Sequence, residues 1–131
     1  MKQRLHRQKG IALIEVLAAT LLISFGLLGL VSLQAKAVQY SVSAEDSQRA
    51  AVLASDLAAE MWGANTAAVG AGVVAAWAGR VADPATSGLP NGLGTVTMLT
   101  PNRARIQISW RPPNLPTGST NRYITDVEIG P

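Results

Sequence analysis

The feature that most constrains this chain is an apolar run of 23 residues from Ile11 to Leu33, which contains a single charge, Glu15. As an α-helix the run would be about 35 Å long at ~1.5 Å per residue. That length matches the hydrocarbon core of a bilayer, which is about 30 Å thick. Apolar residues would surround the whole helix instead of forming one stripe, which favours a position in lipid or inside a bundle of helices. The run therefore predicts a transmembrane helix.

Positive charge is concentrated on the N-terminal side of this run, whereas Lys36 is the only cation between the run and Arg49. The first ten residues contain four cations and no acid: Lys2, Arg4, Arg7 and Lys9. The other seven Lys and Arg residues and the eight acids leave a net charge of −1 on the rest of the chain. The basic character therefore belongs to a leader and not to a nucleic-acid-binding face. The positive-inside rule predicts a cytoplasmic N-terminus, with the residues after the helix on the outer side.

Length and composition exclude several function classes. The 131 residues allow one small domain, and the apolar content of 48% argues against a disordered chain. The absence of cysteine excludes disulfides, thiolate zinc sites and a cysteine nucleophile. His6 is the only histidine and lies in the leader, and we interpret Asp56 and Glu60 as a solvated helix face. The sequence also has no P-loop, nucleophile elbow or dinucleotide fingerprint. We expect no enzyme activity, no cofactor and no metal.

Glu15 follows Gly10, the last residue of the basic stretch, by five positions. An ionised carboxylate at the centre of a membrane helix costs about 2.5–3.5 kcal/mol, so it requires a partner. Cleavage after Gly10 would create one, because the new α-amine of Ile11 would lie four residues before Glu15 on the same helix face. The pair would close within one chain or between neighbouring chains. In the simpler alternative, Glu15 lies near the interface and reaches water.

The residues alone leave three interpretations of this segment open. The first is a secretory signal peptide cut after Ala37, although its apolar region exceeds the usual ~7–15 residues. The second is a plain single-pass anchor of a binding domain. The third is an assembly helix that gains a cation for Glu15 when its leader is removed.

The nine residues from Lys9 to Leu17, Lys-Gly-Ile-Ala-Leu-Ile-Glu-Val-Leu, resemble the class III signal peptide of type IV prepilins and pseudopilins. The resemblance implies that prepilin peptidase cleaves between Gly10 and Ile11 and that Ile11 is then N-methylated. It also implies that Glu15 pairs with the amine of an adjacent subunit during assembly. The first mature residue in this family is usually Phe, whereas it is Ile here.

Two further segments narrow the resemblance. Residues 21–30, Leu-Leu-Ile-Ser-Phe-Gly-Leu-Leu-Gly-Leu, and residues 33–41, with Leu-Gln-Ala-Lys and Gln-Tyr-Ser, are similar to the PilV group of minor pilins, the type IV pilus modification proteins. The similarity covers roughly the first 60 residues. It implies a non-catalytic subunit involved in pilus assembly. The I-type minor pseudopilins of type II secretion systems share the first part of the pattern and are the alternative.

The same resemblance implies a location and a set of partners. The chain would span the bacterial inner membrane once, with its N-terminus in the cytoplasm and its C-terminal domain in the periplasm, and would later enter the extracellular pilus. Its partners would be prepilin peptidase, other major and minor pilins, the inner-membrane assembly platform, and the lipid bilayer before assembly. The residues leave the choice between pilus and secretion system open.

Two glycines and two serines lie within the apolar run. Gly26 and Gly29 each weaken a helix by about 1 kcal/mol relative to Ala. They indicate either a helix that can bend in a fibre or close contact between helices at small residues. We expect Ser24 and Ser32 to bond back to their own helix backbone.

No Pro or Gly interrupts residues 34–62, so we expect the helix to continue to a stop at Gly63. Polar residues at Ser43–Asp46 form a weak capping signal and would allow a kink there. An apolar stripe of helical period follows; its members are Ala50, Leu53, Ala54, Leu57, Ala58 and Met61.

Beyond Gly63 the pattern predicts a short helix over Val69–Trp77 and a loop over Asp83–Gly94. Alternation predicts strands over 95–100, 105–110 and 122–129. The expected fold class is α+β, a long helix packed on a three-stranded antiparallel sheet, and the resemblance implies that it is pilin-like. The expected organisation is a cleaved leader (1–10), a transmembrane and assembly helix (11–33), an amphipathic helix (34–62) and a small sheet domain with loops (63–131).

The tryptophans and the arginines near the C-terminus also suggest roles. We expect Trp110 in the core, and the sequence leaves Trp62 and Trp77 between a core position and a contact surface. Four arginines gather in the last third: Arg103, Arg105, Arg111 and Arg122. We expect them to pair across strands with Asp126 and Glu128 instead of forming a DNA-binding face.

Overall fold

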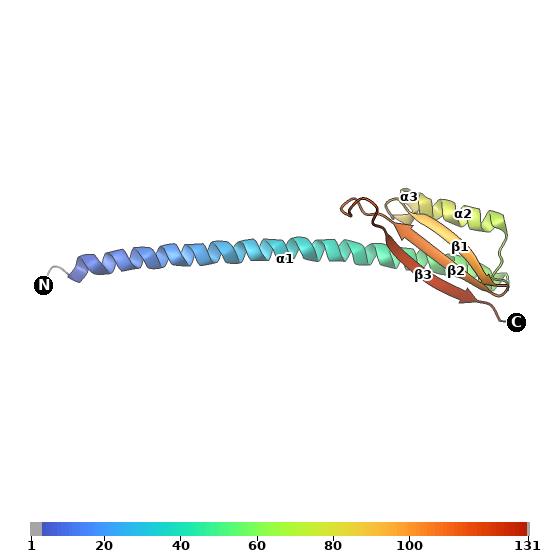
Figure 1. The fold of residues 1–131 in the computed structure, drawn as a ribbon, viewed down its shortest axis with the longest axis horizontal. Helices are drawn as coiled ribbons and strands as arrows, with labels where there is room; N and C mark the ends of the chain where they lie inside the picture. Colours follow the sequence, from blue (N-terminus) through green and yellow to red (C-terminus); the bar gives the residue numbers. More distant parts are fainter. Residues whose placement is uncertain (1–3, 131) are drawn as a thin grey trace. The chain divides into compact units, whose positions relative to one another are not determined.

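The structure, a computed structural model, describes the backbone of residues 4–130 and the side chains of residues 10–130. Contacts divide the chain into two compact units, one up to Val42 and one from Ser43 onward. Six elements follow in order (Figure 1): α1 (Arg4–Gly63), α2 (Ala71–Ala82), α3 (Pro84–Ser87), β1 (Leu93–Thr100), β2 (Arg103–Trp110) and β3 (Asn121–Glu128).

Helix α1 is continuous over 60 residues and ends at Gly63 as expected. After this end the chain turns, with Asn65 in the left-handed region at φ 50°. The helix passes through Ser43–Asp46 without interruption. Asp46 does not cap a new helix there but is 5% exposed, four residues before Ala50 at the start of the buried stripe.

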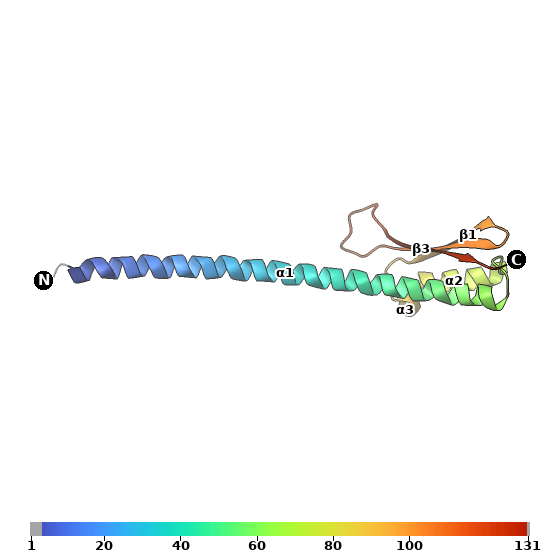
Figure 2. The same cartoon turned by 90° about the horizontal axis from the view of Figure 1, so that it is seen from below.

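The second unit is built in two layers, with the sheet covering one side of α2 and of the part of α1 that belongs to this unit (Figure 2). The predicted stripe of α1 is buried at Ala50, Leu53, Ala54, Leu57 and Met61, and Ala58 is half-buried. The inner face of the sheet supplies the opposite side of the same core, and its buried members are Ala104, Ile106, Ile108, Trp110, Val127 and Ile129. The expected core position of Trp110 is therefore confirmed, with 2% of the residue exposed.

The sheet is antiparallel with the strand order β1-β2-β3. Ile106 of β2 lies opposite Val96 of β1 and Thr125 of β3, which fixes the register. The three predicted strands are confirmed, and each begins one or two residues earlier than alternation indicated. The α+β layout, a long N-terminal apolar helix with a three-stranded antiparallel sheet, is thus the observed one.

The segment between α1 and the sheet differs from expectation. The predicted short helix exists, but it spans Ala71–Ala82 and so extends five residues further. The expected loop over Asp83–Gly94 is wrong in its first part, where α3 forms a single turn. Asp83 caps this turn by accepting a hydrogen bond from Ala85 N at 3.0 Å, Pro84 begins it, and Gly88 ends it at φ 67°. Hydrogen bonds from the Thr86 hydroxyl and the Ala85 amide lower the pKa of the Asp83 carboxyl.

Trp77 of α2 belongs to the core, which settles the alternative left open by the sequence. It is fully buried, and its Nε1–H donates to the Leu53 carbonyl of α1 at 2.8 Å. Its ring lies so close to Gly94 that a Cβ atom on that glycine would come within 2.7 Å of it. Trp62, in contrast, is 58% exposed near the end of α1.

Candidate functional site

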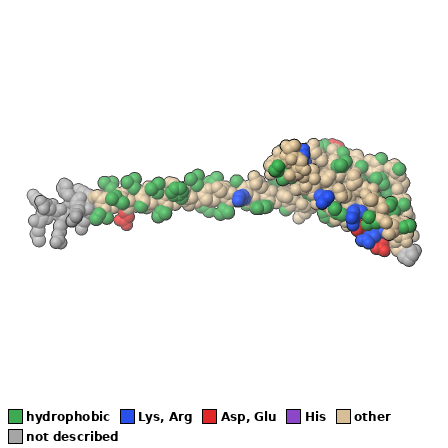
Figure 3. Space-filling model, viewed as in Figure 1, with side chains coloured by type: hydrophobic (Ala, Val, Ile, Leu, Met, Phe, Trp, Pro, Cys, Tyr) green, Lys and Arg blue, Asp and Glu red, His purple; other side chains and the backbone are tan. Residues whose placement is uncertain are grey.

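The candidate functional segment is the first part of α1, where the large apolar side chains are exposed. Leu22 is 73% exposed and Phe25 is 70% exposed. The most apolar window of the helix has a mean hydropathy of 2.4, and none of that window is buried. In the described part of the chain this is the one helix that is long and apolar enough to cross a membrane. Figure 3 shows apolar side chains along the visible side of this helix.

The hydroxyl groups of this segment are satisfied by the helix itself. Thr20 Oγ1 donates to the Leu17 carbonyl at 2.9 Å, and Ser24 Oγ donates to the Thr20 carbonyl at 2.7 Å. Ser32 Oγ donates to the Leu28 carbonyl at 3.0 Å. The expectation for both serines is confirmed, and these three hydroxyls have partners within the helix itself.

Glu15 differs from these hydroxyls. Its side chain is exposed, and among residues 10–130 it forms neither a hydrogen bond nor an ion pair. Ile11, four residues earlier on the same face, is 64% exposed. Water can solvate this carboxylate, but lipid cannot, so a buried position for this segment requires a cation beside Glu15. Cleavage after Gly10 remains a prediction.

The glycines of the segment are embedded in regular helix. A Cβ atom built on Gly10, Gly26 or Gly29 would meet nothing within 4 Å. Packing among the described residues therefore requires none of the three to be glycine. Both interpretations of Gly26 and Gly29, bending in a fibre and close contact with a neighbouring helix, remain predictions about the assembled state.

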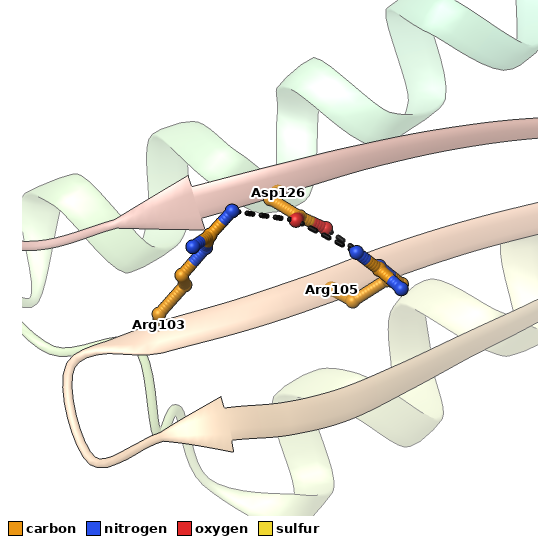
Figure 4. A network of polar contacts seen from close by, with 3 residues as sticks. All are labelled: Arg103, Arg105 and Asp126. Carbon is orange, nitrogen blue, oxygen red and sulfur yellow. Dashed lines mark hydrogen bonds and ion pairs between the residues drawn. The ribbon is translucent and has the colours of Figure 1, made fainter.

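Charged residues on the sheet form a compact cluster, shown in Figure 4. Arg105 holds Asp126 with two hydrogen bonds, from Nε to Oδ1 at 2.7 Å and from Nη2 to Oδ2 at 2.9 Å. Arg103 Nη2 donates to the same Oδ2 at 2.9 Å. These contacts, above all the hydrogen bonds from Arg105, lower the pKa of Asp126 and raise the pKa of Arg105. The expected cross-strand pairing is confirmed for these two arginines.

The other two arginines of the last third are arranged differently. Arg111 Nε donates to the Ser119 carbonyl at 3.3 Å, and Arg122 lies opposite Ser109 in the register. Glu128 lies opposite Arg103, but in the described residues it forms no ion pair. The expectation that Glu128 pairs is therefore wrong, because Arg103 turns to Asp126.

The acids of α1 form no metal centre within the described residues, where no group of three or more His, Cys, Asp or Glu side chains lies together. Glu60 instead pairs with Arg80 of α2 at 3.6 Å.

The sequence analysis did not predict the partly exposed apolar face of α2. The sequence did contain an indication of this face, because the 12 residues of α2 include only one charged residue, Arg80.

Comparison with protein-family models, with curated proteins and with solved structures finds no match to this chain. The functional conclusion therefore depends on α1 and on the residues at its N-terminal end.

Proposed function

We propose that this chain is a minor pilin, a non-catalytic subunit that is processed after Gly10 and assembles through α1 into a type IV pilus. One observation carries the proposal. In the apolar run, Glu15 is a carboxylate that forms no hydrogen bond or ion pair among residues 10–130, and it lies one turn after the Gly10–Ile11 junction. The long apolar helix and the antiparallel sheet also fit a pilin-like architecture.

The mechanism is polymerisation. Before assembly, the apolar run of α1 (residues 11–33) lies in the inner membrane, and the unit that holds the sheet lies outside. Removal of the leader gives Ile11 a cationic amine, which pairs with Glu15 of a neighbouring subunit while the apolar helices bundle. A unit charge pair at 4 Å is worth about 4 kcal/mol at an effective dielectric of 20. That gain is comparable to the cost of about 2.5–3.5 kcal/mol for the unpaired carboxylate, so the pair can set the axial register of the subunits.

The first test is the N-terminus of the mature protein. When the chain is produced together with prepilin peptidase, mass spectrometry should find a product that starts at Ile11. The Gly10→Leu variant should keep the leader, because a bulky side chain blocks close approach of the peptidase to this backbone. A product starting at Val38 would instead support a secreted domain, and one starting at Met1 would support an anchor.

The second test is incorporation into filaments. Glu15→Gln keeps the shape of the side chain and removes its charge, so its amount in sheared pili should fall at least about tenfold, the equivalent of 1.4 kcal/mol. Asp56→Asn is the matched control, since Asp56 is exposed on the later part of α1. Equal incorporation of Glu15→Gln and the parent would contradict the mechanism. Incorporation into a type II secretion pseudopilus alone would identify the I-type minor pseudopilin.

A further inference from the structure

The two edges of the sheet differ in how they are protected. Charged side chains on β3 (Arg122, Asp126 and Glu128) discourage another strand from pairing with it. The β1 edge, Leu93–Thr100, contains no charged residue and no Pro. Leu93 is 58% exposed and Met98 is 43% exposed. Because β1 is the first strand in the order β1-β2-β3, its outer side presents backbone N–H and C=O groups that no strand of this sheet pairs.

An apolar groove of about 420 Å³ lies beside this edge. Its α2 side is a stripe at helical spacing that is distinct from the buried pair Trp77 and Val81. Among its lining residues are Ala71, Val74, Ala75 and Ala78 of α2 and Val96 and Met98 of β1. Helix α2 thus has a second apolar stripe that the core covers less completely. Ala71 and Ala75 are exposed, whereas Val74 and Ala78 are half-buried, and Ala78 packs against the core. We call the β1 edge and this groove together the β1–α2 surface.

We propose that the β1–α2 surface binds an uncharged, extended segment of another polypeptide, which adds as a fourth strand beside β1. The backbone of such a segment satisfies the outer N–H and C=O groups of β1. Alternate side chains of a strand point to one face, so every second residue of the segment enters the groove. The groove lining is uncharged, so a charged side chain there would lose its hydration without gaining a partner. Small or medium apolar residues at alternate positions are the chemistry that fits.

The position of α2 argues against a second copy of this chain as the occupant. Figure 1 shows α2 alongside β1 on the outer side of the sheet, and Figure 2 places α2 in the helix layer beneath it. A second copy paired edge to edge through its own β1 would bring its own α2 into the same space. The surface therefore suits a tail or loop strand that carries no helix layer. This inference concerns residues 67–98 and does not rest on the proposed assembly through α1.

The test uses the full chain in detergent micelles and a capped peptide, acetyl-Thr-Val-Thr-Val-Thr-Val-Thr-amide. Strand addition should slow amide exchange at alternate residues of β1 at least about tenfold, while the intervening amides, already bonded to β2, should not change. A peptide with Lys in place of each Val should give no protection. Unchanged exchange at saturating Val peptide, or equal protection by the Lys peptide, would overturn the proposal.

Two variants locate the binding. Ala75→Glu places a charge in the groove at an exposed helix position and should weaken peptide binding at least tenfold. Ala76→Glu is the matched control, because Ala76 is also exposed but does not line the groove, and it should bind like the parent. If Ala75→Glu bound the peptide as tightly as the parent, the peptide would not occupy the groove, and the proposal would be overturned. Exchange protection of β1 that rises with protein concentration without peptide would assign the surface to a second copy and refute the occupant proposed here.

Discussion

Trp77 joins α2 to α1 by a buried hydrogen bond. Its indole Nε1–H reaches the Leu53 carbonyl at 2.8 Å, and its ring is fully buried. We expect Trp77→Ala to lower the free energy of unfolding by about 3–5 kcal/mol, because it removes a large core ring. Trp77→Phe should lose about 0.5–1.5 kcal/mol for the hydrogen bond, in addition to a packing cost. Urea denaturation of the full chain in detergent measures both.

The matched control for this series is Trp62→Ala. Trp62 is 58% exposed, so its removal should change the free energy of unfolding by less than about 0.5 kcal/mol. If the two alanine variants were equally stable, the core position of Trp77 would be wrong.

Asp126 gives the sheet a defined acid sensitivity. Hydrogen bonds from Arg105 and Arg103 lower its pKa in the folded state below the unfolded value of about 3.9. A lowered carboxyl pKa contributes stability above the unfolded pKa, and this contribution is lost as the pH falls from about 4 through the folded pKa. Titration of the Asp126 carboxyl carbon by NMR should show the lowered value.

Variants separate the two causes of that shift. Arg105→Gln should raise the pKa of Asp126 more than Arg103→Gln does, since Arg105 supplies the largest contribution. Arg122→Gln should leave the pKa unchanged, because Arg122 faces Ser109 in the register. A pKa of Asp126 that is insensitive to Arg105→Gln would show that the cluster of Figure 4 does not form in solution.

At the scale of elements, the close approach of α2 to β1 depends on a glycine. A Cβ atom on Gly94 would lie 2.7 Å from two carbons of the Trp77 ring. Gly94→Ala should therefore destabilise the unit by about 1–3 kcal/mol through overpacking. Gly72→Ala in α2 is the control, because its Cβ would meet nothing within 4 Å. It should stabilise the helix by about 0.5–1 kcal/mol, so thermal unfolding of the two variants should shift in opposite directions.

Periodicity predicted the elements that bury one regular face. The stripe from Ala50 to Met61 and the alternation of β2 each specify one buried side, and both are found in the core. The sequence of α2 shows no such contrast between an apolar and a polar side. With one charged residue, this helix offers no polar side from which its buried side could be predicted. Its C-terminal extension to Ala82 depends on burial of Val81, a tertiary contact that local pattern does not contain.

Local signals for α3 were present but were interpreted as a loop. Asp83 followed by Pro84 is a helix start, and Gly88 is a stop, yet they enclose only one turn. The N-terminal candidate site could be predicted from residue type alone, because Glu15 in an apolar run requires a partner. The β1–α2 surface could not, since it depends on two elements that meet only in the fold.

At the scale of the whole molecule, the predicted topology can be tested with single cysteines, because the chain has none of its own. In spheroplasts without prepilin peptidase, an impermeant maleimide should label Ser43→Cys from outside. Gln8→Cys should react only after lysis, and Ser24→Cys should react only after detergent is added. Labelling of Gln8→Cys in intact spheroplasts would place the N-terminus outside and contradict a cytoplasmic leader.

The strand order β1-β2-β3 also affects how fast the sheet can fold. Each strand pairs with its neighbour in sequence, so every closure in the sheet spans a short stretch of chain. Low contact order of this kind favours rapid folding. The sheet can therefore form soon after the chain is made, because no pairing within it has to wait for distant parts of the chain or for a second molecule.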